Sequence, residues 1–212
     1  MEQVTITNNP RAEIKKSRVE EALATRRRKK ILFWSGGGLI IILFIGVIIW
    51  FATRPQAPLP GVSYANLGQD HVPLDHQDTY NSNPPTSGPH YPSPANWGVY
   101  DYESNDKIFI HNLEHGGIWI SYKPSVSKDV VVELKSFVDS FSGSKLIMAP
   151  RSANDADVAV AAWTHLYTFN ISGGHLSVQQ KKDLETFYVR LKNNGPENVP
   201  DAMTGVDPKA VK

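Results

Sequence analysis

Residues 108–120 read IFIHNLEHGGIWI, and the interpretation of the whole chain depends on this stretch. Apolar, β-branched runs flank it on both sides and are typical of strands, whereas a glycine pair is typical of a turn. If residues 112–114 form a hairpin loop, the Cβ atoms of His111 and His115 face each other roughly 5 Å apart. If the segment is instead one helical turn, residues four apart are again neighbours, at roughly 5–6 Å. Both conformations bring two imidazoles within reach of one ion or one substrate.

The charges of this 212-residue chain are unevenly distributed. Residues 1–30 hold nine Lys/Arg and four Asp/Glu, whereas residues 52–212 hold 13 Lys/Arg and 17 Asp/Glu. A basic tail ahead of an acidic region argues against nucleic acid as the main partner. The chain has no cysteine, which excludes disulfides, thiol catalysis and zinc sites built from cysteine.

Residues 31–52 contain no charged side chain. As a helix they would be about 33 Å long, enough to cross a bilayer core of roughly 30 Å. A cleaved signal peptide would have a shorter apolar core, followed by a small-residue cleavage site that is missing here. We therefore expect an uncleaved signal anchor in the cell membrane. The basic residues 1–30 place the N-terminus in the cytoplasm and the remainder of the chain outside.

The rest of the chain is interpreted as a linker, one domain and a tail. Residues 53–61 carry three prolines, which favours a semi-rigid linker. Residues 62–195 form the predicted extracytoplasmic domain, and residues 196–212 a C-terminal tail. Within the domain, residues 62–102 are rich in turn-forming and aromatic residues, which predicts an ordered wrap over its surface.

Hydrophobic periodicity predicts the elements of the domain. They are strands at 107–112 and 117–122 forming a hairpin, a helix from Ser125 or Ser127 to about Ser140, strands at 145–149 and within 157–169, and a helix from Ser177 to about Asn193. The order ββαββα is a circular permutation of the ferredoxin-like plan. We expect an α+β domain in which two helices lie on one face of a four-stranded antiparallel sheet, preceded by one transmembrane helix.

Five of the seven histidines lie within 45 residues: His71, His76, His90, His111 and His115. Imidazole suits zinc and copper, and a carboxylate can complete the ligand set. His111 and His115 would supply two ligands, and His90 and His71 from the wrap could close the site. Glu114 could bind the metal or hydrogen-bond the second nitrogen of a ligating histidine. We predict a Cu(II) or Zn(II) site made of these five residues. His165 is expected to be packed, and His76 and His175 to be solvated.

Two other functions compete with simple metal binding. A metal-dependent hydrolase would need an open coordination position and a general base, for which Glu114 is the candidate. Residues 111–115 also match the inverted zinc-protease signature H-x-x-E-H, which requires a long helix. The apolar run before the motif and the glycine pair after it are both poor for a helix, which argues against a protease. In the third interpretation the histidines are incidental, and the aromatic residues of the wrap form a binding or scaffold surface for the cell envelope.

The motifs PPTSGPHY at residues 84–91 and HNLEHGG at residues 111–117, with GVY at 98–100 between them, resemble the bacterial domain-of-unknown-function family 3105. The resemblance covers about residues 61–170. It implies one N-terminal membrane helix, which agrees with residues 31–52, and it implies no catalytic role for any residue. Such proteins tend to be encoded near exported proteins suspected of copper handling, so the resemblance favours copper over zinc.

Overall fold

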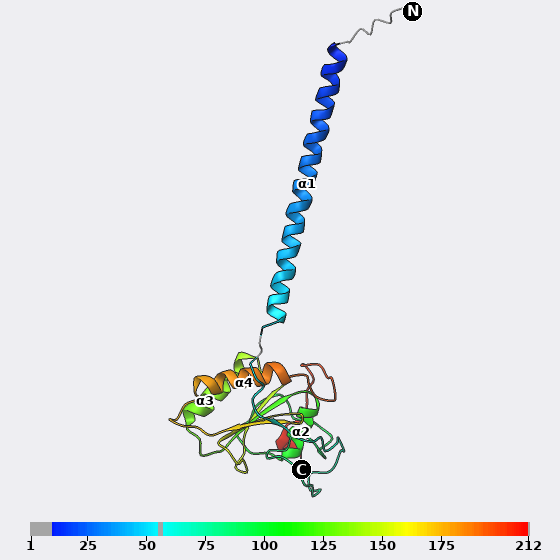
Figure 1. The fold of residues 1–212 in the computed structure, drawn as a ribbon. Coiled ribbons are helices and arrows are strands. Elements are labelled where there is room, and N and C mark those ends of the chain that lie inside the picture. Colours follow the sequence, from blue (N-terminus) through cyan, green and yellow to red (C-terminus); the bar gives the residue numbers. More distant parts are fainter. Residues whose placement is uncertain (1–9, 55–56, 212) are drawn as a thin grey trace, which may run out of the picture. The chain divides into compact units, whose positions relative to one another are not determined.

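The computed structural model describes residues 10–54 and 57–211 and divides the chain into two compact units, Met1–Gln56 and Ala57–Lys212 (Figure 1). Residues 1–9 of the predicted basic tail, residues 55–56 of the predicted linker and residue 212 lie outside the described residues. All of the described strands belong to the second unit.

The first unit is one long helix, α1 (Pro10–Ala52), in which the basic and the apolar stretches are continuous. Its segment Ile14–Ala52 is long and apolar enough to cross a membrane, a test that a signal sequence near the N-terminus also passes. The large apolar side chains between Ile31 and Phe51 are exposed on all sides of the helix. A helix that is apolar all round is typical of a membrane span or of a buried helix.

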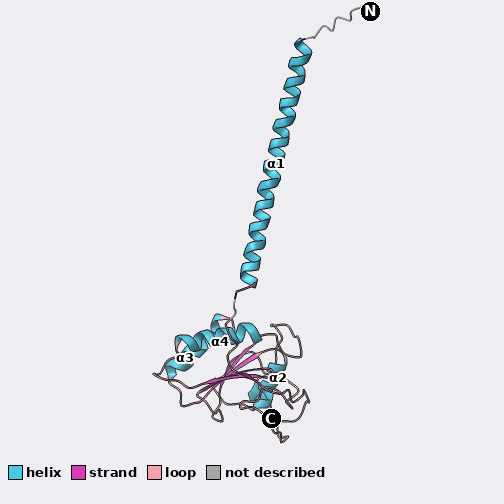
Figure 2. Ribbon diagram, in the orientation of Figure 1, coloured by secondary structure: helices cyan, strands magenta, loops and turns pink. Residues whose placement is uncertain are grey.

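The second unit contains a six-stranded mixed sheet (Figure 2). Its strands are β1 (Val62–Ser63), β2 (Gly98–Val99), β3 (Ile118–Tyr122), β4 (Leu146–Pro150), β5 (Val158–Ala162) and β6 (His165–Phe169). Their order across the sheet is β1-β6-β5-β3-β4-β2. The pairs β3–β4 and β2–β4 are parallel, whereas β3–β5, β5–β6 and β1–β6 are antiparallel.

The prediction of a four-stranded antiparallel sheet was wrong, although the α+β class is correct. Strands β3 and β4 are consecutive in the chain and parallel, because helix α3 (Lys128–Ser140) between them returns the chain to the same end of the sheet. The two-residue strands β1 and β2, both from the wrap, form the two edges of the sheet. The predicted ferredoxin-like permutation did not include them.

Residues 107–112 were predicted as a strand but belong to helix α2 (Asp106–Glu114). The side chain of Asn105 accepts a hydrogen bond from the Lys107 N–H and caps the N-terminus. At the other end, the N–H groups of Gly116 and Gly117 donate to the carbonyls of Leu113 and Asn112, which is a Schellman motif. Residues 107–114 are all buried, so the apolar run before His111 reflects burial around the helix and not a strand. Of the two conformations considered for His111 and His115, the helical turn is the correct one.

The two faces of the sheet are covered by different helices (Figure 2). Helices α3 and α4 (Val178–Leu191) pack on one face, which carries Ile118 and Ile120 of β3. Helix α2 and aromatic residues of the wrap pack on the other face, which carries Trp119. Because successive strand residues point to opposite faces, β3 contributes to both cores and is buried along its whole length.

The two helices predicted around residues 127–140 and 177–193 are confirmed. Ser127 caps α3 by accepting from the Val130 N–H. Ser177 caps α4 in a capping box with Gln180. Each cap fixes the residue at which the helix begins.

Residues 196–211, predicted as a tail, contact the domain at several points. The Glu197 N–H donates to the Glu114 carbonyl at 3.0 Å, and the Val206 N–H donates to the Pro94 carbonyl at 2.8 Å. The Tyr102 hydroxyl donates to Asp207, which caps a short 3-10 helix, η1 (Pro208–Ala210). The segment after α4 thus passes next to the C-terminal end of α2.

Candidate metal centre

The last turn of α2 carries three side chains of the predicted site. Glu114 follows His111 by three residues and His115 follows it by four. The three side chains therefore lie on one surface of the helix. The Nε2 atoms of His111 and His115 are 3.1 Å apart. Glu114 Oε2 lies 3.9 Å from His111 Nε2.

Two histidines from the wrap join this turn. His71 and His90 pair in an isolated parallel bridge, in which the Val72 N–H donates to the His90 carbonyl and the His90 N–H donates to the Asp70 carbonyl. The Tyr91 N–H then donates to the Lys107 carbonyl of α2. These backbone bonds bring His90 and His71, which precede the first residue of α2 by 16 and 35 residues, to its last turn.

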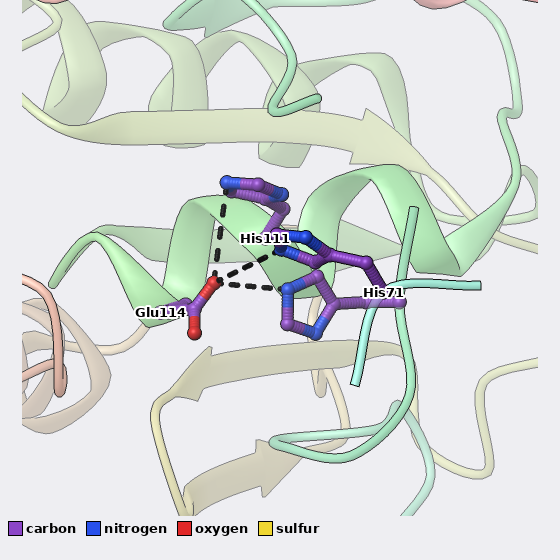
Figure 3. A group of neighbouring side chains, drawn as sticks. His71, His111 and Glu114 are labelled. Carbon is purple, nitrogen blue, oxygen red and sulfur yellow. Dashed lines mark hydrogen bonds and ion pairs between the residues drawn. The ribbon is translucent and has the colours of Figure 1, made fainter. Parts of the chain in front are cut away.

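Glu114 Oε2 is the common partner of the three histidines (Figure 3). It lies 2.9 Å from His90 Nε2 and 3.9 Å from both His71 Nε2 and His111 Nε2. One ligand atom from each of His71, His90, His111 and Glu114 falls in a group whose members all lie within 4.8 Å of one another. We call these four residues the first group.

Backbone carbonyls fix the orientation of two of these rings. His90 Nδ1 lies 2.8 Å from the Gly88 carbonyl oxygen, and His111 Nδ1 lies 2.8 Å from the Tyr91 carbonyl oxygen. A carbonyl oxygen only accepts, so in each neutral ring the proton lies on Nδ1 and the lone pair on Nε2. The Nε2 atom of His90 therefore faces Glu114 Oε2 at 2.9 Å, and that of His111 lies 3.9 Å from Glu114 Oε2 and 3.1 Å from His115 Nε2.

The first group is buried on every side except that of His71. His90, His111 and Glu114 are 0%, 5% and 2% exposed, whereas the His71 side chain is 48% exposed. The rings of His71 and His111 are stacked with an interplanar angle of 13°, and Trp163 contacts His90 edge-on. Solvent and ions can therefore reach the group past His71.

A family model described as "Protein of unknown function (DUF3105)" matches residues 71–202. The chain belongs to the DUF3105 family. Neither the curated proteins nor the solved structures contain a match to it. The resemblance stated from the motifs is thereby confirmed, and the match runs further toward the C-terminus than residue 170, to the segment that follows α4.

A second group in the DUF3105 region comprises Glu114, His115 and Glu197, again with ligand atoms within 4.8 Å of one another. His115 Nε2 lies 3.1 Å from Glu197 Oε2. The prediction that His111 and His115 are neighbours is correct. His115, however, belongs to this second group and not to the first.

Sequence reasoning missed two residues of this centre. Gln69 Nε2 donates to Glu114 Oε1 at 2.5 Å, which holds the oxygen that does not face the histidines. Glu197 lies in the segment that was expected to be a tail. No short-range sequence signal marks either residue, because both reach Glu114 through the tertiary structure.

Burial keeps two of the histidines neutral. It lowers the pKa of the His111 imidazole to about 4, although the hydrogen bond to the Tyr91 carbonyl opposes this shift. Burial also lowers the pKa of His115, against the attraction of Glu197 and Glu114. Neutral imidazole is the form that binds metal ions, so neither ring has to lose a proton to ligate at pH 7.

The remaining residues of HNLEHGG shape the end of α2 in this DUF3105 domain. The Asn112 side chain accepts from the Ala95 N–H and donates to the Ala95 carbonyl, at 2.8 and 2.9 Å. Gly116 has a φ of +73°, and a Cβ there would lie 2.6 Å from the Asn193 Cα. A Cβ at Gly117 would lie 2.5 Å from the Trp97 ring. The motif thus combines candidate ligands with residues that let neighbouring segments approach closely.

The other three histidines lie outside both groups. His165 is partly buried and bonds the Ser63 hydroxyl, in keeping with a packed residue. His76 and His175 have side chains that are 52% and 63% exposed and pair with Asp78 and Glu133.

Proposed function

We propose that this protein is anchored in the membrane by α1 and that its extracytoplasmic domain binds a divalent transition metal. The ligands are Nε2 of His71, His90 and His111 and a carboxylate oxygen of Glu114. The basic residues ahead of the apolar segment support a cytoplasmic N-terminus.

The observation that carries the proposal is the convergence of lone pairs in the first group. His90 and His111 use their Nδ1 protons on backbone carbonyls, and both Nε2 atoms face a buried carboxylate oxygen. Lone pairs that face one another repel unless a proton or a cation lies among them. Carbonyl or carboxylate partners on the second nitrogen are also what orients metal-binding histidines in proteins.

Charge supports the same conclusion. Glu114 is 2% exposed, and its ion-pair partners among the described residues are His71, His90 and His111. Because burial keeps His111 neutral at pH 7, this imidazole brings no positive charge to the carboxylate. A buried carboxylate is costly unless it is paired with positive charge, and a divalent cation would supply that charge.

The distances fit a first-row ion. Ligand atoms placed about 2.1 Å from a tetrahedral metal lie about 3.4 Å from one another. The separations from Glu114 Oε2, 2.9 Å to His90 and 3.9 Å to His71 and His111, lie on both sides of that value.

The donor set narrows the choice of ion. Three imidazoles and one carboxylate suit Cu(II) and Zn(II), and there is no cysteine to favour Cu(I). Copper(II) binds such sites more tightly than zinc does at equal availability. Gln69 donates to Oε1 of Glu114, and Oε2 faces the histidine nitrogens, which supports a ligand role for this carboxylate over a general-base role.

Metal content of the full chain tests the proposal. The protein would be purified in detergent with a histidine-free tag, incubated with Cu(II) or Zn(II), dialysed and measured by elemental mass spectrometry. His71→Ala and His111→Ala should lose the tightly bound ion. His175→Ala, which removes an exposed histidine outside both groups, is the matched control and should retain it. If the parent protein binds neither metal, the proposal is wrong, and the scaffold interpretation of the histidines gains weight.

A further inference from the structure

The second group lies directly beside the first and shares one residue with it. Its members are Glu114, His115 and Glu197, and Glu114 also belongs to the first group. His115 does not belong to the first group, in which all ligand atoms lie within 4.8 Å of one another. The side chains of α2 thus face two neighbouring collections of donor atoms.

The polar contacts of the His115 side chain are all made by one nitrogen. The residue is 2% exposed, and among the described residues its Nδ1 atom has no hydrogen-bond partner. Its Nε2 atom lies 3.1 Å from Glu197 Oε2 and 3.1 Å from His111 Nε2. This buried imidazole therefore directs its only engaged nitrogen into the space between Glu197 and the first group.

The backbone holds this arrangement in place. The Glu197 N–H donates to the Glu114 carbonyl at 3.0 Å, and the buried Lys145 ammonium donates to the His115 carbonyl at 2.9 Å. A Cβ at Gly195 would lie 2.2 Å from the Glu114 carbonyl oxygen, so only glycine allows the segment after α4 to approach this closely. Glu197 is brought to α2 by these contacts and not by its neighbours in sequence.

We propose that the centre holds two divalent cations, with Glu114 as a shared ligand and with His115 and Glu197 as the remaining protein ligands of the second ion. The inference rests on the proposed function of the first group. A carboxylate that bridges two ions and separations of about 3.5–4 Å between the ions are features of two-metal sites. Glu114 and Glu197 together supply two negative charges, which offset half of the four positive charges of the two ions.

The second ion binds more weakly than the first. It has three protein ligands, one of which is the half-exposed Glu197, whose side chain is 51% exposed. Three protein ligands leave a coordination position open to water or to a small anion. The two positions therefore fill in sequence, the first group before the second.

Metal stoichiometry of the full chain in detergent separates this inference from the proposed function. Zn(II) titration followed by isothermal calorimetry should give two ions per chain, a tight one and a weaker one. Glu197→Gln should leave one tight ion, because it removes a ligand of the second position only. Glu185→Gln, an exposed carboxylate on α4, is the matched control and should retain two ions. Thermal melting of each variant checks that the domain remains folded.

Cu(II) supplies an independent readout. Two Cu(II) ions bridged by Glu114 should couple magnetically, so the parent protein should show a reduced and broadened electron paramagnetic resonance signal at two equivalents. Glu197→Gln should show the signal of an isolated Cu(II) ion. One ion per parent chain would overturn the two-metal centre and leave the proposed function standing. No ion in the parent would overturn both, and two ions in Glu197→Gln would place the second ion elsewhere.

Discussion

His90 Nε2 lies 2.9 Å from Glu114 Oε2, and the two residues are 0% and 2% exposed. His90 comes from the irregular wrap and Glu114 from the last turn of α2. This buried contact therefore joins a loop segment to a helix that lies further along the chain. The contact also sets the orientation of the carboxylate on which the first and second groups both depend.

Gln69 should influence metal affinity without binding the metal. Its side chain donates to Glu114 Oε1 and so orients the carboxylate. Gln69→Ala is expected to weaken metal binding about 10- to 100-fold, the usual effect of removing a partner of a ligand. Competition with a chromophoric chelator measures this change. Gln179→Ala on α4 is the control, and equal affinities of the two variants would contradict the assigned role of Gln69.

Asn112 should stabilise the fold through its two hydrogen bonds to Ala95. Asn112→Ala leaves a buried N–H and a buried carbonyl without partners and should lower the free energy of unfolding by about 2 kcal/mol or more. Denaturant unfolding of the full chain in detergent measures it. Asn81→Ala removes one exposed hydrogen bond to the Ala65 carbonyl and should cost less than about 1 kcal/mol. Similar losses in both variants would contradict the prediction.

Two glycines with similar backbone angles should respond differently to alanine. Gly116 and Gly143 have φ values of +73° and +66°, so an alanine at either position is strained. Only at Gly116 would the new Cβ meet backbone, 2.6 Å from the Asn193 Cα, whereas nothing lies within 4 Å at Gly143. Gly143→Ala should cost about 1 kcal/mol of stability, and Gly116→Ala clearly more. Unfolding midpoints that agree for the two variants would show that the close approach is not maintained.

Glu133 should make the domain sensitive to acid. The Leu176 N–H, and after it Lys181, lower the pKa of Glu133 below its ordinary value of 4.5, although burial opposes them. A lowered pKa means that the carboxylate contributes stability above about pH 4.5 and that this contribution is lost as the pH falls through the folded-state value. Glu133→Gln should therefore melt at a lower temperature than the parent at pH 7. The difference should shrink as the pH falls below 4, and a constant difference would contradict the assignment.

The chain has no cysteine, which makes its topology easy to test. In intact cells, a membrane-impermeant maleimide should label Lys182→Cys, at an exposed position of α4, because the domain is proposed to lie outside. Lys16→Cys, in the basic part of α1, should be labelled only after the membrane is permeabilised. The opposite pattern would reverse the proposed orientation, and release of the domain into the medium would identify the apolar segment as a cleaved signal.

Local signals in the sequence were sufficient for several elements. Ser127 and Ser177 mark the starts of α3 and α4, because a hydroxyl that accepts from the first turn is a property of neighbouring residues. The same kind of signal, Asn105 before α2 and Gly116 after it, was present but was outweighed by the β-branched residues 108 and 110. Strand propensity describes a half-buried surface, whereas α2 is buried all round, so the local preference was overridden by tertiary packing.

The sequence alone determined the kinds of candidate donor, the proximity of His111 to His115, the apolar segment long enough to cross a membrane and the family. Only the tertiary structure decided which donors meet. Backbone pairing inside the wrap brings His71 and His90 to Glu114, and the close approach at Gly195 brings Glu197 to His115. The physical reason is that such contacts depend on backbone hydrogen bonds and close packing between distant segments, which periodicity and spacing along the chain do not encode.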